Sequence, residues 1–400
     1  MDVHAPLAPP GHIDWVQTRS AWQTWFLTQA LPRWFTQGVD RHHGGFFEKL
    51  DAQGHPVEEP RRTRVVARQL YVIAAAPKLG WQVDTSDLLR HGLDFLLHRL
   101  RCPDGTFATS FDVRNDVRNP HFDLYEQAFA LFALASVHQT RPAAFSDLPA
   151  LARDLLDRLR AGWQHPLGGF QEGHPPSAPL RSNPHMHLLE AALQWHRASQ
   201  GDASIWAELA DELVALALDR LLDRHSGLVT EWFDLNWRPL ASDRGSEAEP
   251  GHQFEWGWLL TQWAQARPEH PRHAEALAAA RRMIDLGEAR GVDPARGVAI
   301  NTIGTDGRWR DPCAKLWPQT ERIKAWVSRA ELATSSGERA HALTQANGAC
   351  ETLLRYLDHP VQGAWHESMD PQGHWQAQDT RASSLYHIVY ALETALALRA

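Results

Sequence analysis

Apolar residues recur at three- and four-residue spacing in six segments rich in Ala and Leu, which is the pattern of helices buried along most of their surface. These segments are residues 64–79, 124–137, 186–195, 254–264, 321–332 and 385–398. A second set alternates with the first and carries Arg, Asp or Glu along one face, as helices with one side in water do. Its members are residues 86–100, 148–159, 203–222, 273–288 and 338–357. The alternation predicts an inner ring made from the first set and an outer ring made from the second.

A glycine next to an aromatic or branched apolar residue recurs six times between these segments. The glycines are Gly45, Gly105, Gly169, Gly227, Gly297 and Gly363, at steps of 58 to 70 residues. A step of this length holds two full helices and a loop, and glycine suits the tight turn that such a loop needs. We therefore expect an all-α fold, an (α/α)6 barrel of six helical hairpins, formed by residues 1–400 as a single domain.

Charge and composition exclude several kinds of partner. The formal net charge is −8 and Lys and Arg are scattered, so no basic surface for nucleic acid is expected. No apolar run approaches the roughly 18 residues of a membrane span, and the N-terminus lacks the pattern of a secretion signal. The three cysteines have no CxxC spacing, which is typical of a protein in a reducing cytoplasm.

One polar side chain stands near the start of each inner helix. These are Arg64, Tyr125, His187, Glu255, Glu321 and His387, at steps of 61 to 68 residues. In a closed barrel all six starts face one end, so we expect these side chains to meet in one pocket. The chain also has 18 Trp and 23 His, and aromatic rings at a concave barrel mouth are suited to stacking on a sugar.

Local spacing near the helix starts adds further candidates. Asn183 and His187 are four residues apart on one helical face, with His185 turned away. His252 and Glu255 are three apart, so the carboxylate could set the tautomer of the imidazole or raise its basicity.

A metal site is the alternative for this pair, with His187 and Glu321 completing the ligands. Because no HExxH motif, paired Asp or Cys ligand accompanies them, we expect no metal. Trp317 and Glu321 add an aromatic wall and a carboxylate. Two imidazoles facing one pocket, from His252 and His387, are what proton transfer near neutral pH requires.

Seven blocks in order along the chain resemble the N-acylglucosamine 2-epimerase superfamily, which includes cellobiose 2-epimerases and bacterial mannose isomerases. The blocks are GGFFEKLD (44–51), TRVVARQ (63–69), DLYEQAF (123–129), NPHMHLLE (183–190), PGHQFEW (250–256), LWPQTE (316–321) and SSLYH (383–387). The resemblance implies that the protein interconverts sugars by moving the proton on C2 through an enediol-type intermediate, without a cofactor.

The resemblance implies roles for individual residues. It makes His387 the principal base at C2 and His252 the partner acid or base, with Glu255 supporting His252. It further implies sugar contacts from Arg64, Asn183 and His187 around O1 and O2, and from Tyr125, Trp317 and Glu321 along the wall. The expected partner is a small monosaccharide, and the expected assembly a monomer or homodimer.

The reaction outcome depends on where the proton returns. Return to C1 on the same face gives a ketose, and return to C2 on the opposite face gives an epimer. A polar stretch at residues 235–250 could shorten the cleft, so we expect an isomerase that converts D-mannose to D-fructose, with a sugar 2-epimerase as the alternative. An (α/α)6 glycoside hydrolase using Glu255 with Glu321 or Asp123, and a sugar-binding protein without activity, remain as other classes.

Overall fold

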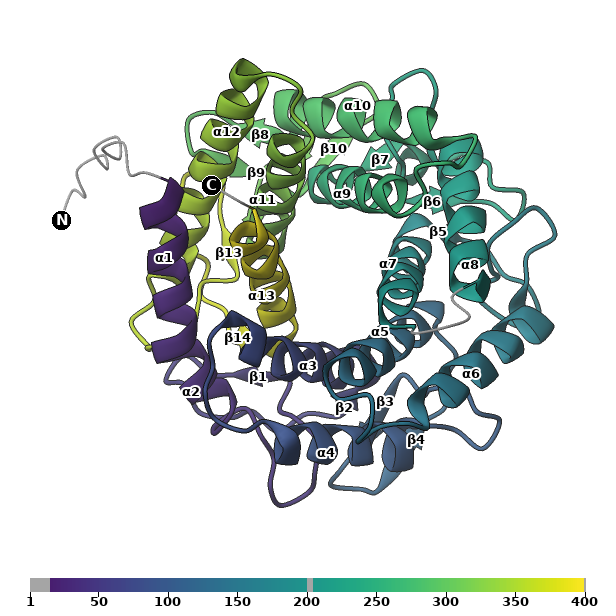
Figure 1. Ribbon diagram of the computed structural model, residues 1–400, viewed down its shortest axis with the longest axis vertical. Coiled ribbons are helices and arrows are strands. Elements are labelled where there is room, and N and C mark those ends of the chain that lie inside the picture. Colours follow the sequence, from purple (N-terminus) through teal and green to yellow (C-terminus); the bar gives the residue numbers. More distant parts are fainter. Residues whose placement is uncertain (1–14, 200–203, 399–400) are drawn as a thin grey trace.

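Helices form two concentric rings in the computed structural model, which describes residues 15–199 and 204–398 (Figure 1). The inner ring consists of α3 (Thr63–Ala75), α5 (Leu124–Thr140), α7 (Ser182–Ala198), α9 (Pro250–Ala266), α11 (Leu316–Glu331) and α13 (Ala382–Ala397). The outer ring consists of α1 (Trp15–Trp25) with η1 (Phe26–Ala30) and α2 (Leu31–Trp34), α4 (Ser86–Phe95) with η3 (Leu96–Leu100), α6 (Leu148–Trp163), α8 (Ser204–Leu216) with η4 (Ala217–Leu221), α10 (His273–Gly291) and α12 (Ser336–Leu357). The predicted (α/α)6 barrel is confirmed.

The predicted rings match the observed ones, except for one helix that the sequence pattern did not reveal. The sixth outer helix is α1 to α2, at the N-terminal end of the described chain. Its sequence is rich in Trp, Thr and Gln rather than Ala and Leu, so its helix propensity is weak. The first residue of the predicted range 203–222 lies outside the described residues.

Three inner helices begin several residues earlier than predicted. Helix α7 begins at Ser182, α9 at Pro250 and α11 at Leu316, and each has a proline within its first three residues. Proline is favoured in the first turn because no intrahelical partner is needed for its missing N–H. The ranges predicted from the sequence begin only after these prolines. As a result, Asn183, His252 and Trp317 lie inside the first turn of their helices.

Short antiparallel strands lie where each outer helix connects to the next inner helix. They are β1 (Lys49–Leu50), β2 (Arg61–Arg62), β3 (Ser110–Asp112), β4 (Val117–Asn119), β5 (Leu180–Arg181), β6 (Trp232–Phe233), β7 (Glu247–Ala248), β8 (Val292–Asp293), β9 (Val298–Ala299), β10 (Thr302–Gly304), β11 (Trp309–Asp311), β12 (Ala314–Lys315), β13 (Ser368–Met369) and β14 (Thr380–Arg381). They form small sheets of two or three strands, in the orders β1–β14, β2–β3–β4, β5–β6, β7–β10–β11, β8–β9 and β12–β13. The strands thus surround the end of the barrel at which the inner helices begin.

The six predicted turn glycines all adopt left-handed backbone conformations, with φ between +70° and +86°. Four of them are followed, directly or one residue later, by a ring that is almost fully buried: Phe46, Phe107, Phe170 and Trp365. Each ring anchors its loop to the core, which explains the recurring sequence signature. Within the described residues, none of the helices combines the length and the apolar character that crossing a bilayer requires.

Candidate active site

A cavity of about 410 Å³ opens at the end of the barrel where the inner helices begin. Trp317 from α11, His387 from α13 and Arg68 from α3 line it, together with residues of the surrounding strands and loops. Hydrogen bonds and ring contacts join the side chains of neighbouring inner helices at this end of the barrel. The inner helix starts therefore bring polar groups together at one end of the barrel, although only Trp317 and His387 of the predicted site residues line this cavity.

His387 is held by a carboxylate from the neighbouring inner helix. Its Nδ1 donates to Oε1 of Glu321 over 2.9 Å, so Nε2 is the nitrogen free to accept a proton. Burial, with help from the positive charge of Arg68, lowers the pKa of His387 to about 4 despite the opposing effect of Glu321. The other oxygen of Glu321 lies 2.6 Å from Nζ of Lys324. At neutral pH His387 is therefore an uncharged imidazole.

His252 is a cation at neutral pH, and its carboxylate partner differs from the predicted one. Its Nδ1 donates to Oε2 of Glu231 over 3.0 Å, and Glu231 rather than Glu255 sets the tautomer. Burial alone would lower the pKa of His252, but Glu231 and Glu249 outweigh it and raise the pKa to about 10. Glu255 adds only a smaller, through-space contribution in the same direction. The spacing of three on one helix suggested Glu255, whereas Glu231 comes from the loop before β6.

Trp317 lies between the two histidines. Its ring centroid is 5.0 Å from that of His252 and 5.8 Å from that of His387, and both ring pairs are tilted. A flat apolar surface flanked by a neutral and a cationic imidazole is suited to a sugar ring, which stacks its C–H face and exposes its hydroxyl groups to both sides.

A second group of side chains lies around His187. Its Nδ1 donates to Oε2 of Glu190 over 3.0 Å, and the ring packs edge-on against Tyr125 at 5.0 Å. Glu255 Oε1 lies 3.9 Å from the same Nδ1, and neither oxygen of Glu255 has a hydrogen-bond partner among the described residues. Burial, reinforced by Glu321, raises the pKa of Glu255 well above its usual range.

Unpaired buried polar atoms mark where a hydroxylic ligand would be bound, because such atoms are costly without a partner. The side-chain oxygen of Asn183 is also buried without a partner in the described part of the chain. Asn183 on α7 and Glu255 on α9 thus carry unpaired polar atoms, although neither residue lines the cavity.

The arginine that faces the cavity is not the one we predicted to do so. Arg64 Nε forms an ion pair with Glu126 at 2.8 Å, and its guanidinium lies over the Tyr125 ring. Arg68, one turn later on α3, lines the cavity and donates to the Tyr125 hydroxyl over 2.8 Å. No carboxylate among the described residues forms an ion pair with Arg68. The repeat of Arg at positions 64 and 68 was the sequence signal for this second arginine.

Three other predicted features take structural roles. His185 is bound at both ring nitrogens, to Arg181 O and to the backbone N–H of Phe170, so it does turn away from the pocket as predicted. The segment at residues 235–250 does not line the cavity. Part of it, β7, is paired with β10. The idea of a lid that shortens the cleft therefore gains no support here. Asp123, the alternative hydrolase carboxylate, caps α5 and pairs with Arg181.

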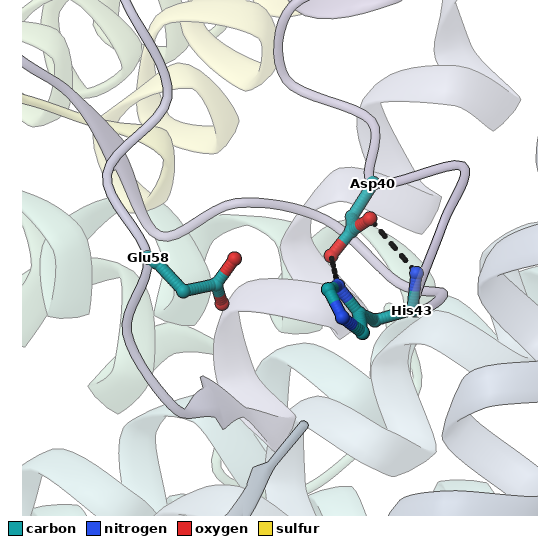
Figure 2. Close-up of side chains that lie close together, drawn as sticks. All are labelled: Asp40, His43 and Glu58. Atoms are coloured by element: carbon teal, nitrogen blue, oxygen red, sulfur yellow. Dashed lines mark hydrogen bonds and ion pairs between the residues drawn. The ribbon is translucent and has the colours of Figure 1, made fainter. Parts of the chain in front are cut away.

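Three clusters of His and acidic side chains are close enough to hold a metal ion in the described residues. Figure 2 shows one of them, in which Glu58 points toward Asp40 and His43. Arg61 already bridges this cluster, with Nη2 2.8 Å from Asp40 and 2.9 Å from Glu58. The other two clusters are His187, Glu190 and Glu255, and Glu231, Glu249 and His252. Each contains a histidine Nδ1 that is hydrogen-bonded to a carboxylate of its own cluster.

Comparison with known proteins agrees with the geometry. The family model described as N-acylglucosamine 2-epimerase matches residues 45–391. A mannose-6-phosphate isomerase of Rhizobium meliloti is 40% identical over 93% of this chain and 96% of its own, and a D-mannose isomerase of Thermobifida fusca is 30% identical over 84% of each. In fold, the chain is similar to cellobiose 2-epimerase from Spirochaeta thermophila, with a TM-score of 0.81, 22% identity and 96% of both chains covered. The chain belongs to the N-acylglucosamine 2-epimerase family and is an enzyme of the isomerase class.

Proposed function

We propose that this protein is an aldose–ketose isomerase that converts D-mannose to D-fructose by proton transfer between C2 and C1. The observation that supports it best is the difference in protonation between the two histidines beside Trp317. His387 is a neutral base and His252 is a cationic acid at the same pH. Titratable groups whose pKa values are driven apart by their surroundings are the usual sign of an assigned acid and base.

In this mechanism His252 opens the sugar ring and His387 moves the proton. The Nε2–H of His252 donates a proton to the ring oxygen as the bond from C1 to that oxygen breaks, and the same nitrogen then takes the proton of the C1 hydroxyl. This gives the open-chain aldehyde and restores the protonated His252. The free Nε2 of His387 then takes the proton from C2, which gives an enediolate with its charge on O1. A proton passes from the hydroxyl group on C2 to O1, and His387 returns its own proton to C1 on the same face, so the carbonyl group is now at C2. The ketose is formed without any group leaving the sugar.

Negative charge that develops on O1 and O2 needs donors fixed in place beforehand. We assign this role to Arg68, which lines the cavity without a carboxylate partner in the described chain. Oriented donors of this kind are worth about 3 kcal/mol each in transition-state stabilisation. His187 donates its Nδ1–H to Glu190 and its pKa is lowered by burial, so its Nε2 is an acceptor and we assign it to a sugar hydroxyl group instead. Asn183 and Glu255, with their unpaired polar atoms, are proposed to hold neighbouring hydroxyl groups. Trp317 is the aromatic part of the wall, and Tyr125 holds Arg68 in place by accepting a hydrogen bond at its hydroxyl group.

A phosphorylated mannose is a second candidate substrate. The Rhizobium meliloti relative is named for mannose 6-phosphate. In this chain Lys315 and Arg381 both line the cavity, and neither forms an ion pair with a described residue. Two free cations at the rim could bind a phosphate on the carbon farthest from the reaction.

A proton NMR time course in D2O separates these possibilities, with mannose, mannose 6-phosphate and glucose as substrates. We expect fructose as the first product from mannose, with any deuterium at C1. Glucose labelled at C2 and formed ahead of fructose would identify a 2-epimerase instead. A much lower KM for mannose 6-phosphate than for mannose would make the phosphorylated sugar the substrate.

The variant His387→Ala tests the proposed base. We expect a loss of about a thousandfold in kcat with the fold retained by circular dichroism, because general-base catalysis contributes 10²–10⁴-fold. A variant that keeps a tenth of the wild-type rate would contradict the assignment.

We propose that the reaction needs no metal or other cofactor. Activity should survive prolonged EDTA treatment and should not rise on addition of divalent ions. Chelator inactivation that is reversed by metal would overturn this proposal.

The three cysteines are all free, in keeping with a cytoplasmic protein. We propose that the chain acts as one catalytic domain, as a monomer or homodimer.

A further inference from the structure

A lysine is fully buried beneath the cavity, on the helix that carries Glu321. Lys324 and Glu321 both have no exposed side-chain surface, and Nζ lies 2.6 Å from Oε2. The ammonium group also lies over the rings of Trp258 and Tyr390, 4.0 and 4.8 Å from their centroids. Burying an ammonium ion is costly, and a buried ion pair is often no more stable than apolar side chains of the same size. Stability alone therefore does not account for this lysine.

The carboxylate that Lys324 contacts is the one that binds the proposed base. Glu321 uses Oε2 for Lys324 and Oε1 for His387 Nδ1, so the three side chains form a line from the barrel interior to the cavity. This order resembles the arrangement in which a buried acidic group fixes the tautomer of a catalytic histidine. Here the acidic group is itself held by a cation.

We propose that Lys324 is a positioning residue for the reaction at His387. Its positive charge keeps Glu321 ionised, and ionised Glu321 accepts the Nδ1–H of His387, which leaves Nε2 unprotonated toward the sugar. This inference rests on the proposed function only in so far as His387 is the base.

The surroundings explain why a cation is required. Glu190 from α7 and Glu255 from α9 add negative charge near Lys324, and burial favours the protonated form of every carboxyl group there. The charged and titratable groups that act on this cluster from the packed inner helices are Arg68, His187, Glu190, His252, Glu255, Tyr386 and Tyr390. None of these seven groups forms an ion pair with Glu321 in the described residues, whereas Lys324 does.

Loss of the Lys324 charge should shift the acid limb of the pH profile in the same direction whether the added proton binds to Glu321 or to His387. Glu321 and His387 titrate as a pair, and the active form carries one proton fewer than the inactive form. An added proton on either Glu321 or His387 blocks the base. Removing the charge of Lys324 stabilises that extra proton in both cases, so the acid limb of kcat/KM must move to higher pH.

The variants Lys324→Met and Lys324→Gln remove the charge while keeping most of the side-chain volume, and Lys324→Arg keeps the charge. Arg329→Met is the matched control, because Arg329 pairs with Asp285 at 2.7 Å on the outward side of the same helix. We expect the acid limb to rise by about 1–3 pH units in the two neutral variants, by the size of effect that a charge at this distance has on a carboxyl pKa. It should stay in place in Arg329→Met and move least in Lys324→Arg.

Circular dichroism shows which of the two neutral variants folds. If that variant is slower but its acid limb has not moved, Lys324 has only a structural role and the proposal is overturned. Nitrogen-15 NMR of the wild-type histidines gives a test that needs neither turnover nor a folded variant. We expect His387 at pH 7 to be the neutral tautomer protonated at Nδ1. Protonation at Nε2 would overturn the inference, whereas a correct tautomer in a protein that leaves mannose unchanged would count against the proposed function alone.

Discussion

The two histidines of the site differ in pKa because different sets of carboxylates surround them. His387 has one carboxylate partner, Glu321, whose charge is largely offset by Lys324. His252 faces Glu231 and Glu249 without a comparable cation in contact. Burial then dominates at the first histidine and the carboxylates dominate at the second, which is why their pKa values move in opposite directions.

We expect a bell-shaped pH dependence of kcat/KM with a broad plateau. Activity needs His387 unprotonated and His252 protonated, so it should fall below about pH 4 and above about pH 10, following the two pKa values. Initial rates of ketose formation across this range measure it, with circular dichroism at each pH to exclude unfolding. An acid limb near pH 6.5 would mean that His387 titrates like a histidine in water.

The variant Glu231→Gln should move only the alkaline limb. Gln keeps an oxygen for His252 Nδ1–H but removes the negative charge, so the pKa of His252 falls and the limb moves down by about 1–3 pH units. Glu247→Gln is the matched control. Glu247 lies in nearby β7 and accepts from Trp232 rather than from His252. Equal profiles for wild type and Glu231→Gln would remove Glu231 from the account of the acid.

Residue types and spacing on the inner helices predicted that His252, Trp317 and His387 would lie close together, because a polar or aromatic residue recurs near the start of each helix. They did not predict Glu231, which reaches His252 from a loop, since loop carboxylates have no periodic signal. Lys324 was hidden for a different reason. It lies on an apolar helix face three residues after Glu321, and the pattern alone does not distinguish a buried cation from an exposed one.

At the scale of helices and loops, the inner ring was predictable because its helices are apolar on nearly all sides. In α5 and α9 almost every residue is buried, and this leaves no ambiguity with a strand or a surface helix. The starts of the helices were less certain, since proline is compatible both with the residue before a helix and with its first turn. The outer helix α1 to α2 was missed because its Trp-rich sequence is held by packing rather than by propensity.

The turn glycines make a prediction at this scale. Gly169 has φ +71°, and an added Cβ would lie 2.7 Å from Leu216 and 2.9 Å from His185. Gly169→Ala should therefore cost about 1–2 kcal/mol for the backbone conformation and a further 1–3 kcal/mol for overpacking. Urea unfolding followed by circular dichroism measures the free energy of unfolding.

Gly162→Ala is the control for this change. Gly162 lies in α6 with no atom within 4 Å of an added Cβ, so alanine there should stabilise the protein by up to about 1 kcal/mol through helix propensity. Similar effects of the two substitutions would show that the recurring glycines are not required by backbone geometry.

The whole barrel depends on joining its two ends. Strand β1 pairs with β14, and α13 packs against α3, so the last hairpin meets the first (Figure 1). His387 is on α13 and Arg68 on α3, and Arg68 Nη1 is 3.5 Å from the backbone oxygen of Ser383. Closure of the ring therefore sets the distance between the proposed base and the proposed oxyanion donor.

Trp34 tests this junction. It is 1% exposed, stacks on Trp365 with ring centroids 5.1 Å apart, and donates from Nε1 to Gly363 O over 3.0 Å, linking the first outer helix to the loop before the last inner helix. Trp34→Ala should lower the free energy of unfolding by about 3–5 kcal/mol, the usual cost of truncating a buried Trp. Trp309→Ala, at a site 45% exposed, should change it by no more than about 1 kcal/mol, although its Nε1 donates to Arg290 O. If the junction holds the site together, urea should abolish the activity of Trp34→Ala at the concentration that unfolds its helices, and both midpoints should move together. A stability equal to that of Trp309→Ala would mean that the ring is closed by β1–β14 and α3–α13 alone.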